Sequence, residues 1–272
     1  MSLKVTLLGT GTSHGVPMIG CACAVCTSGD PRDRRTRPSI LMERPDDPGR
    51  STILVDTSTD LRAQALAHGV TRVDAILFTH SHADHIFGLD EVRRFNVIQG
   101  APIPCFGDER TLADLRRTFA YIFAPPSEGG GVPKITLFRI GGPFLFGGFE
   151  ITPVPLMHGH QPILGFRVGS FAYLTDCSRI PGESWPLLAG VRTLVVDALR
   201  DRPHPTHFTV EEALQVVARL APERAYFTHI CHDLPHAATC ARLPSGVELA
   251  YDGLVLEIAD DEQMADTERR GR

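Results

Sequence analysis

The sequence has no apolar run that approaches the roughly 18 residues of a membrane-spanning helix. We also expect no apolar leader segment at its start, because Leu3–Leu8 has the pattern of a strand. A reducing cytoplasm is therefore the expected location, with no membrane partner. In that compartment the seven cysteines are expected to be metal ligands or buried thiols and not disulfides.

A strong excess of one charge is also missing. Lys and Arg number 27 and Asp and Glu number 32, so the formal net charge is −5. This balance argues against a general binder of nucleic-acid backbones, which needs a basic surface. It is compatible with one small anionic substrate held by metal ions.

No repeat of fixed period and no linker divides the chain. Its 272 residues, 43% hydrophobic and 22% charged, have the balance of an ordinary globular protein. We expect one domain over residues 1–258, followed by a disordered charged tail over 259–272. The Pro/Gly cluster at 125–131 is either a plain surface connection or part of an active-site rim.

Short apolar segments typical of strands recur along the chain, and most of them end in residues capable of chemistry. They cover residues 5–8, 52–55, 75–78, 151–156, 171–174, 193–196 and 225–227. Helical patterns lie between them, at Asp60–His68, directly after His85, at Glu109–Phe123 and at Val210–Leu220. Strands that bring side chains to a common edge, with helices between them, predict an α/β sandwich that carries its site on loops.

The segment His80-Ser81-His82-Ala83-Asp84-His85 places four metal-binding side chains within six positions, between a predicted strand and a predicted helix. His80 and His82 point the same way along an extended segment, so they can chelate one ion. Asp84 and His85, where the chain changes direction, can face a second ion. Isolated histidines are usually structural or merely exposed, but this spacing predicts a metal site.

A binuclear site for hydrolysis needs more ligands than this motif supplies, because one ion activates water and both stabilise the charge of the displacement. The ends of later strands offer His158, Asp176 and His229. Asp176 can bridge two ions with its two carboxylate oxygens, which a histidine cannot do. Each of these residues alone could simply cap a strand, but their order after the first motif makes the set specific.

With these residues the chain resembles the metallo-β-lactamase superfamily of hydrolases. The resemblance covers nearly the whole length and implies an αββα sandwich, with two mixed sheets packed face to face and helices outside. It implies one divalent ion on His80, His82 and His158, a second on Asp84, His85 and His229, and a bridge between them from Asp176. The two ions, zinc or manganese, would activate the attacking hydroxide. Histidine at position 82 favours hydrolysis over redox chemistry, since the related flavodiiron proteins have a glutamate there.

A second metal site is indicated by Cys21, Cys23 and Cys26, which leave a tetrahedral structural zinc one ligand short. His232 is the candidate for the fourth position. An iron–sulfur cluster that uses Cys231 as the fourth ligand is one alternative, and simple buried thiols are the other.

Together, the cysteine pattern and Gly9-Thr10-Gly11-Thr12-Ser13-His14-Gly15-Val16-Pro17 resemble the PhnP-like branch of that superfamily. The namesake of the branch is a phosphoribosyl 1,2-cyclic phosphate phosphodiesterase. The resemblance implies a structural zinc held by three cysteines and the histidine at position 232, and it implies a homodimer. It says less about the substrate, because members of the branch need not share one.

Cleavage of a phosphodiester needs a proton for the departing alkoxide, and histidine suits neutral pH. Related enzymes place that histidine on a loop before the last ligand, where His207 matches best and His204 is the alternative. Thr209 is the expected N-cap of the following helix, whose positive end favours a nearby phosphate. We expect His207 and Asp84 to be the catalytic residues.

Some polar residues near these motifs have more than one interpretation. His14 is either a turn residue or a substrate contact, and His160 is either structural or a partner of a ligand. Asp56, at the end of a strand, can orient ligand histidines through hydrogen bonds. Arg93 and Arg94 either contact a phosphate or lie on a solvated helix face.

The resulting prediction is a cytoplasmic, metal-dependent phosphodiesterase for a small cyclic or nucleotide-like phosphate. A tRNA 3′-processing nuclease of the RNase Z type is the first alternative, but the residues between Phe95 and Met157 show no Lys/Arg-rich arm for tRNA. A non-catalytic or cofactor-biosynthesis protein of the PqqB group is the second alternative. Absence of hydrolysis at full metal occupancy would favour that second alternative.

Overall fold

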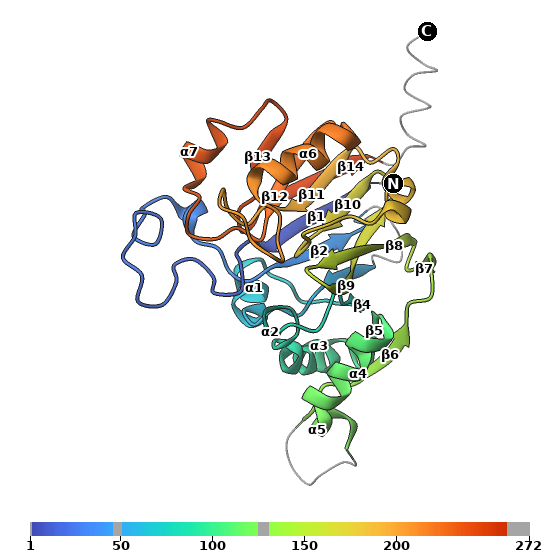
Figure 1. Cartoon of the computed structure of the whole chain (residues 1–272). Coiled ribbons are helices and arrows are strands. Elements are labelled where there is room, and N and C mark those ends of the chain that lie inside the picture. The colour runs from blue at the N-terminus through green and yellow to red at the C-terminus, as the bar shows by residue number, and fades with distance from the viewer. Residues whose placement is uncertain (1, 46–50, 125–130, 260–272) are drawn as a thin grey trace.

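Two seven-stranded mixed sheets form the centre of the computed structural model, which describes residues 2–45, 51–124 and 131–259 (Figure 1). The first sheet consists, in spatial order, of β14 (Val255–Ala259), β1 (Ser2–Gly9), β2 (Ser39–Glu43), β3 (Thr52–Val55), β4 (Ala75–Leu77), β5 (Ile103–Gly107) and β6 (Ile135–Arg139). The second consists of β13 (Val247–Leu249), β12 (Arg224–Thr228), β11 (Thr193–Asp197), β10 (Phe171–Leu174), β9 (Gln161–Val168), β8 (Phe149–His158) and β7 (Phe144–Phe146).

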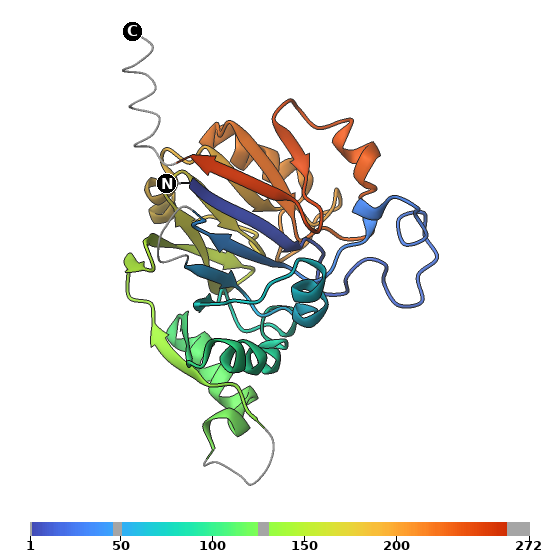
Figure 2. The ribbon, with the colours of Figure 1, turned by 180° about the vertical axis from the view of Figure 1, so that it is seen from behind.

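Helices cover the outer faces of both sheets, as Figure 1 and the reverse view in Figure 2 show. On the first sheet lie α1 (Leu61–Ala67), α2 (Ala83–Ile86), α3 (Val92–Gln99), α4 (Glu109–Thr118) and α5 (Ala120–Phe123). On the second sheet lie α6 (Val210–Leu220) and α7 (His236–Cys240). The predicted αββα sandwich is therefore confirmed.

The alternation of side chains along each strand explains these layers. On β3, Ile53 and Val55 enter the core between the two sheets, whereas Leu54 packs under the helices of the first sheet. On β10, Phe171 and Tyr173 face the same central core. Because successive side chains of a strand point to opposite faces, an apolar run without alternation predicts a strand covered on both sides.

Two predicted helices are interrupted. The helix expected directly after His85 is not continuous: α2 ends at Ile86, a 3-10 helix covers Leu89–Glu91, and α3 begins at Val92. The backbone N–H of Gly88 donates to the carbonyl oxygen of Thr57 at 2.9 Å, outside the helix, and so interrupts the helical hydrogen bonds. The helix expected at Glu109–Phe123 breaks at Phe119 into α4 and α5. The helix expected at Val210–Leu220 is confirmed as α6.

The two ends of the described chain lie side by side, since Ser2 of β1 pairs with Ala259 of β14 (Figure 2). Ala259 is thus part of the sheet and not of the predicted tail, whose residues 260–272 lie outside the described residues. Residues 125–130 of the predicted loop also lie outside the described residues. Within the described part of the chain, no helix has the length and apolar character needed to cross a membrane.

Strands of both sheets deliver polar residues to one edge of the sandwich. Asp56 follows β3, Asp176 comes two residues after β10, and His229 follows β12, and all three adopt left-handed backbone angles, with φ of 63°, 56° and 57°. Such conformations cost about 1–3 kcal/mol each for residues other than glycine. Strain at three strand ends of one edge marks the place where the site is built.

Arg35 ties the segment before β2 to the chain after β12. Its side chain is fully buried and donates to the carbonyl oxygens of Cys231 (3.0 Å) and Leu234 (2.8 Å). It also forms an ion pair with Asp33 at 3.0 Å. A buried charge is tolerated only when it is paired and hydrogen-bonded, and here both conditions are met.

We predict that Arg35→Met lowers the free energy of unfolding by about 3–5 kcal/mol, because it leaves Asp33 buried without its counter-charge. Urea denaturation followed by circular dichroism measures the change. The matched control is Arg32→Met, which removes the exposed ion pair with Asp30 and should cost at most about 1 kcal/mol. Equal losses in the two variants would contradict the role assigned to Arg35.

Candidate metal centre and active site

The histidine motif occupies the turn from β4 to α2, as its sequence predicts. His80 is buried at the end of the extended segment, and His82 is the N-cap residue of α2. Asp84 and His85 lie inside α2, and both side chains are buried. The helix begins at Ala83, so the change from extended to helical backbone redirects the second pair of side chains away from the first.

Residues from the second sheet complete this cluster. The ligand atoms of Asp84, His85, Asp176 and His229 all lie within 4.8 Å of one another, so these four residues could hold one metal ion. Asp176 lies between the two histidines, with one carboxylate oxygen 3.0 Å from Nε2 of His85 and the other 3.1 Å from Nε2 of His229. A carboxylate that presents each oxygen to a different ligand is suited to bridging.

The remaining three predicted ligands form a histidine group beside this one. The ring centroids of His80 and His82 are 4.5 Å apart, those of His82 and His158 are 5.0 Å apart, and those of His80 and His158 are 5.6 Å apart. The closest grouping of ligand atoms for His158, however, is with Asp176 and His207. The structure thus brings the seven predicted residues into one cluster, although His80 and His82 join it through ring contacts and belong to none of the groups whose ligand atoms lie within 4.8 Å of one another.

Hydrogen bonds on Nδ1 orient several of these rings. His85 Nδ1 lies 2.7 Å from the Asp56 carboxylate, and His158 Nδ1 donates to the carbonyl oxygen of Asp176 at 2.8 Å. The Thr79 hydroxyl donates to Asp56 at 2.8 Å, so its oxygen is left to accept from His80 Nδ1 at 3.0 Å. Partners of this kind set the tautomer and leave Nε2 available as a metal ligand. The sequence-based role of Asp56 matches this geometry.

The unpartnered nitrogens test whether a metal fits. Nε2 of His80, His85 and His229 is buried and makes no hydrogen bond with any described residue. Buried polar atoms without a partner are rare and call for an explanation. Here the Nε2 atoms of His85 and His229 face carboxylate oxygens at 3.0 and 3.1 Å without hydrogen-bond geometry. A cation between these nitrogens and oxygens would satisfy both.

The electrostatics of the cluster also favour a cation. Burial alone would lower the pKa of His85, but the carboxylates of Asp176, Asp84 and Asp56 outweigh it and raise that pKa well above its usual value. Burial would likewise lower the pKa of His229, yet Asp176 and Asp84 raise it to about 10. The buried carboxylates therefore stabilise positive charge at this point, which divalent ions would supply with the histidines neutral.

His207 lies beside the cluster and is paired with a second buried acid. Its Nδ1 lies 2.8 Å from the Asp197 carboxylate, and its ring stacks on that of His229 at 4.5 Å. His207 precedes α6, whose N-cap Thr209 forms the predicted cap together with Glu212. The partnership with Asp197 was not foreseen, although an aspartate at the end of β11, ten residues before a candidate acid, was a usable signal.

The cysteine cluster also assembles around His232. Its Nδ1 lies 3.2 Å from Cys21 Sγ, 3.4 Å from Cys23 Sγ and 3.6 Å from Cys26 Sγ, so these four residues could hold a metal ion. The backbone N–H of Cys26 lowers the pKa of Cys23 to about 6, which favours the thiolate. Cys231 is not part of this group, and its sulfur instead accepts the N–H of Asp233. The geometry favours a Cys₃His site over the iron–sulfur alternative.

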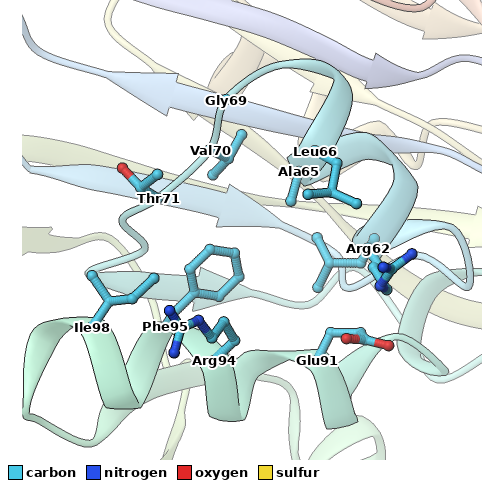
Figure 3. A pocket seen from close by; sticks show the side chains of 11 residues that line it. Arg62, Ala65, Leu66, Gly69, Val70, Thr71, Glu91, Arg94, Phe95 and Ile98 are labelled. Atoms are coloured by element: carbon cyan, nitrogen blue, oxygen red, sulfur yellow. The ribbon is translucent and has the colours of Figure 1, made fainter.

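The other predicted candidates lie outside the metal groups. His14 and His204 line a cavity that borders His207, whereas His160 is exposed. Arg93 pairs with Asp90 at 3.1 Å on the surface of α3. Arg94 lines a more apolar pocket between α1 and α3, shown in Figure 3, which contains none of the candidate ligands. That pocket is therefore separate from the candidate active site.

Comparisons with known proteins identify the family of this chain. Residues 51–230 match the family described as Beta-lactamase superfamily domain. The crystal structure of a diphosphatase from the PhnP family is 45% identical and superposes with a TM-score of 0.88 over 95% of this chain and 98% of that one.

Curated relatives point to several activities. An octanoyltransferase of Porphyromonas gingivalis is 36% identical over 255 residues, which are 93% of this chain and 51% of that protein, so the chain spans about half the length of this relative. A coenzyme PQQ synthesis protein B of Methylorubrum populi is 24% identical over 72% of each chain. A ribonuclease Z of Mycolicibacterium gilvum is 36% identical over 61% of this chain and 57% of that protein.

We predict that Asp56→Asn weakens divalent metal binding at the histidine cluster about 10- to 100-fold, because His85 loses the charged partner that orients it. Titration against a competing chelator, with zinc or manganese, measures the change. The cysteine cluster should keep its metal. Asp74→Asn is the matched control, since Asp74 lies just before β4, at the opposite end of that strand from the histidine motif. An unchanged affinity in Asp56→Asn would contradict this role.

Proposed function

The chain belongs to the β-lactamase superfamily and to its PhnP-like branch, and from this premise we propose that it is a binuclear metal-dependent phosphodiesterase. Its proposed substrate is a small cyclic or nucleotide-like phosphate. The observation that carries the proposal is the position of the His207–Asp197 pair, directly beside a buried histidine–aspartate cluster whose Nε2 atoms lack partners.

The residues proposed as metal ligands divide between two ions. His80, His82 and His158 would hold the first, Asp84, His85 and His229 the second, and Asp176 would touch both. Bound divalent ions, zinc or manganese, would supply an activated water and neutralise charge on the phosphoryl oxygens. Cys21, Cys23, Cys26 and His232 would hold a structural zinc.

His207 is proposed as the general acid. Asp197 accepts from its Nδ1 and so leaves Nε2 to carry the proton that the departing alkoxide needs. The Asp197 carboxylate, 2.8 Å from Nδ1, also holds the imidazole ring of His207 in one orientation. Asp197 acts through His207 and is a positioning residue.

Hydrolysis of a diphosphate is the second candidate reaction. It is favoured by the 45% identity to a protein described as a diphosphatase, which covers nearly the full length of both chains. The metal ligands and His207 would serve this reaction too, because cleavage of a P–O–P bond also needs a metal-activated water and a stabilised leaving oxygen. An RNase Z-type activity ranks below both, because the residues between Phe95 and Met157 contain no Lys/Arg-rich arm.

We predict that metal-loaded protein hydrolyses bis(4-nitrophenyl) phosphate and at least one of ribose 1,2-cyclic phosphate and the cyclic nucleotides, and that it leaves precursor tRNA intact. Phosphate release and product chromatography on metal-analysed protein measure this. Turnover confined to a dinucleoside diphosphate would select the second candidate. If the protein cleaves no phosphodiester and no diphosphate at full metal occupancy, a non-catalytic role like that of the PqqB group replaces the proposal.

We predict that His207→Ala lowers kcat about 10²- to 10⁴-fold for substrates with alkoxide leaving groups. For bis(4-nitrophenyl) phosphate the loss should stay below about 10-fold, because nitrophenolate departs without a proton. Metal content should not change. His160→Ala, which alters an exposed histidine close in sequence to His158, is the control and should keep full activity. An equal loss on both substrate types would assign His207 to metal binding and not to proton transfer.

A further inference from the structure

His229 differs from other histidines of the cluster in what orients its ring. Nδ1 of His80, His85 and His158 each has a hydrogen-bond partner, at 3.0, 2.7 and 2.8 Å. Nδ1 of His229, in contrast, is buried and makes no hydrogen bond with any described residue. Its ring stacks against those of His85 and His207, with centroids 6.2 and 4.5 Å away. A ring without a hydrogen-bond partner takes its direction from the backbone that carries it.

The backbone at His229 is held through the residue that follows it. His229 has a left-handed φ of 57°, a conformation that persists only when surrounding contacts hold it. The N–H of Ile230 donates to the carbonyl oxygen of Thr10 at 2.9 Å, and the carbonyl oxygen of Ile230 accepts the N–H of Thr12 at 3.2 Å. Both backbone polar groups of Ile230 therefore depend on where the glycine motif after β1 places Thr10 and Thr12.

The two glycines beside Thr10 allow this placement. A side chain at Gly9 or Gly11 would collide with carbonyl oxygens of the segment 35–37, which runs before β2. Glycine is the residue that permits such a close approach of two backbones. The N–H of Gly11 donates to the carbonyl oxygen of Thr36 at 2.8 Å. The Gly-Thr-Gly part of the motif thus lies directly against this segment.

Asp252, in the turn between β13 and β14, joins Thr10 to Thr36. One carboxylate oxygen accepts the N–H and the hydroxyl of Thr10, at 2.9 and 2.8 Å, and the other accepts the N–H and the hydroxyl of Thr36, at 2.7 and 2.6 Å. Burial raises the pKa of Asp252 to about 6, so at neutral pH the carboxylate is ionised and accepts from all four donors. Hydrogen bonds to an ionised acceptor are stronger than neutral ones, so Thr10 is firmly held.

We propose that Asp252 is a positioning residue for His229. It fixes Thr10, Thr10 holds Ile230, and Ile230 maintains the backbone from which the His229 ring reaches the metal site. Asp252 belongs to none of the groups that could hold a metal ion in the described part of the chain, so it acts through these neighbours. The inference rests on the proposed function in one respect, the assignment of His229 as a metal ligand.

The test compares metal binding of wild-type protein, Asp252→Ala and Asp252→Asn by titration with manganese, which thiolate sites disfavour, against a competing chelator. In Asp252→Ala we expect one of the two ions of the histidine cluster to bind about 10-fold more weakly, as when a metal ligand loses an outer support. The affinity for the other ion and the zinc content of the cysteine cluster should not change. Asp252→Asn should lie between, since it keeps one acceptor oxygen.

A spectroscopic readout separates positioning from general support of the fold. In cobalt-loaded protein, the ring protons of His229 should give hyperfine-shifted NMR signals, assigned by their loss in His229→Gln. We expect these signals to move or broaden in Asp252→Ala, because the ring no longer has a fixed direction, while those of His80 stay in place. A merely structural role would lower stability and leave the His229 signals where they are.

Asp74→Ala is the matched control. It removes a carboxylate that likewise accepts the N–H of another segment, that of Thr52 at 2.8 Å, but at the end of β4 away from the histidine motif. Unchanged affinities for both ions in Asp252→Ala would overturn the proposal, and so would an equal loss in Asp74→Ala. If Asp252→Ala does not fold, Asp252→Asn decides. If nothing is cleaved, the proposed function fails, whereas the titration still decides the role of Asp252.

Discussion

The contact of Asp176 with two histidines joins the halves of this molecule. His85 lies in α2, directly after β4 of the first sheet, and His229 follows β12 of the second, yet both Nε2 atoms lie within 3.1 Å of the same carboxylate. Neither sheet could build this site alone. The packing of the two sheets, through a core of alternating apolar side chains, sets the distance between them. The site therefore depends on the same packing that forms the fold.

Burial of so many ionisable groups at one edge requires a compensating charge. The pKa of Asp84 and that of Asp176 are lowered in spite of burial, because the neighbouring histidines supply positive charge. The left-handed backbone conformations of Asp56, Asp176 and His229 add local strain to the free-energy cost of burying these charges. A site that is both strained and charged persists when many surrounding contacts hold its residues in place. The hydrogen bonds of Asp56 to Thr79 and to His85 are part of that support.

The N-terminal segment contributes a second support. Arg35 binds the carbonyl oxygens of Cys231 and Leu234, and the cysteine cluster converges on His232 from the same segment of chain. Both contacts hold the residues that directly follow His229. A metal in the cysteine cluster would thus stiffen the floor of the active site without touching the substrate. The cavity that His14 and His204 line lies between the active site and the cysteine cluster, since His207 and His232 both line it.

The residues alone determined the chemistry of the site and the type of its main elements. The spacing of His80, His82, Asp84 and His85 predicts metal binding because the periodicity of strand and helix is local. The sequence also predicted α6 to the residue, since its capping box and apolar pattern agree. What only the tertiary structure decided involves neighbours far apart in the chain. The break at Gly88 depends on the carbonyl oxygen of Thr57, and the orientation of His207 depends on Asp197. No pattern within one segment records such contacts, because they form only when the two sheets meet.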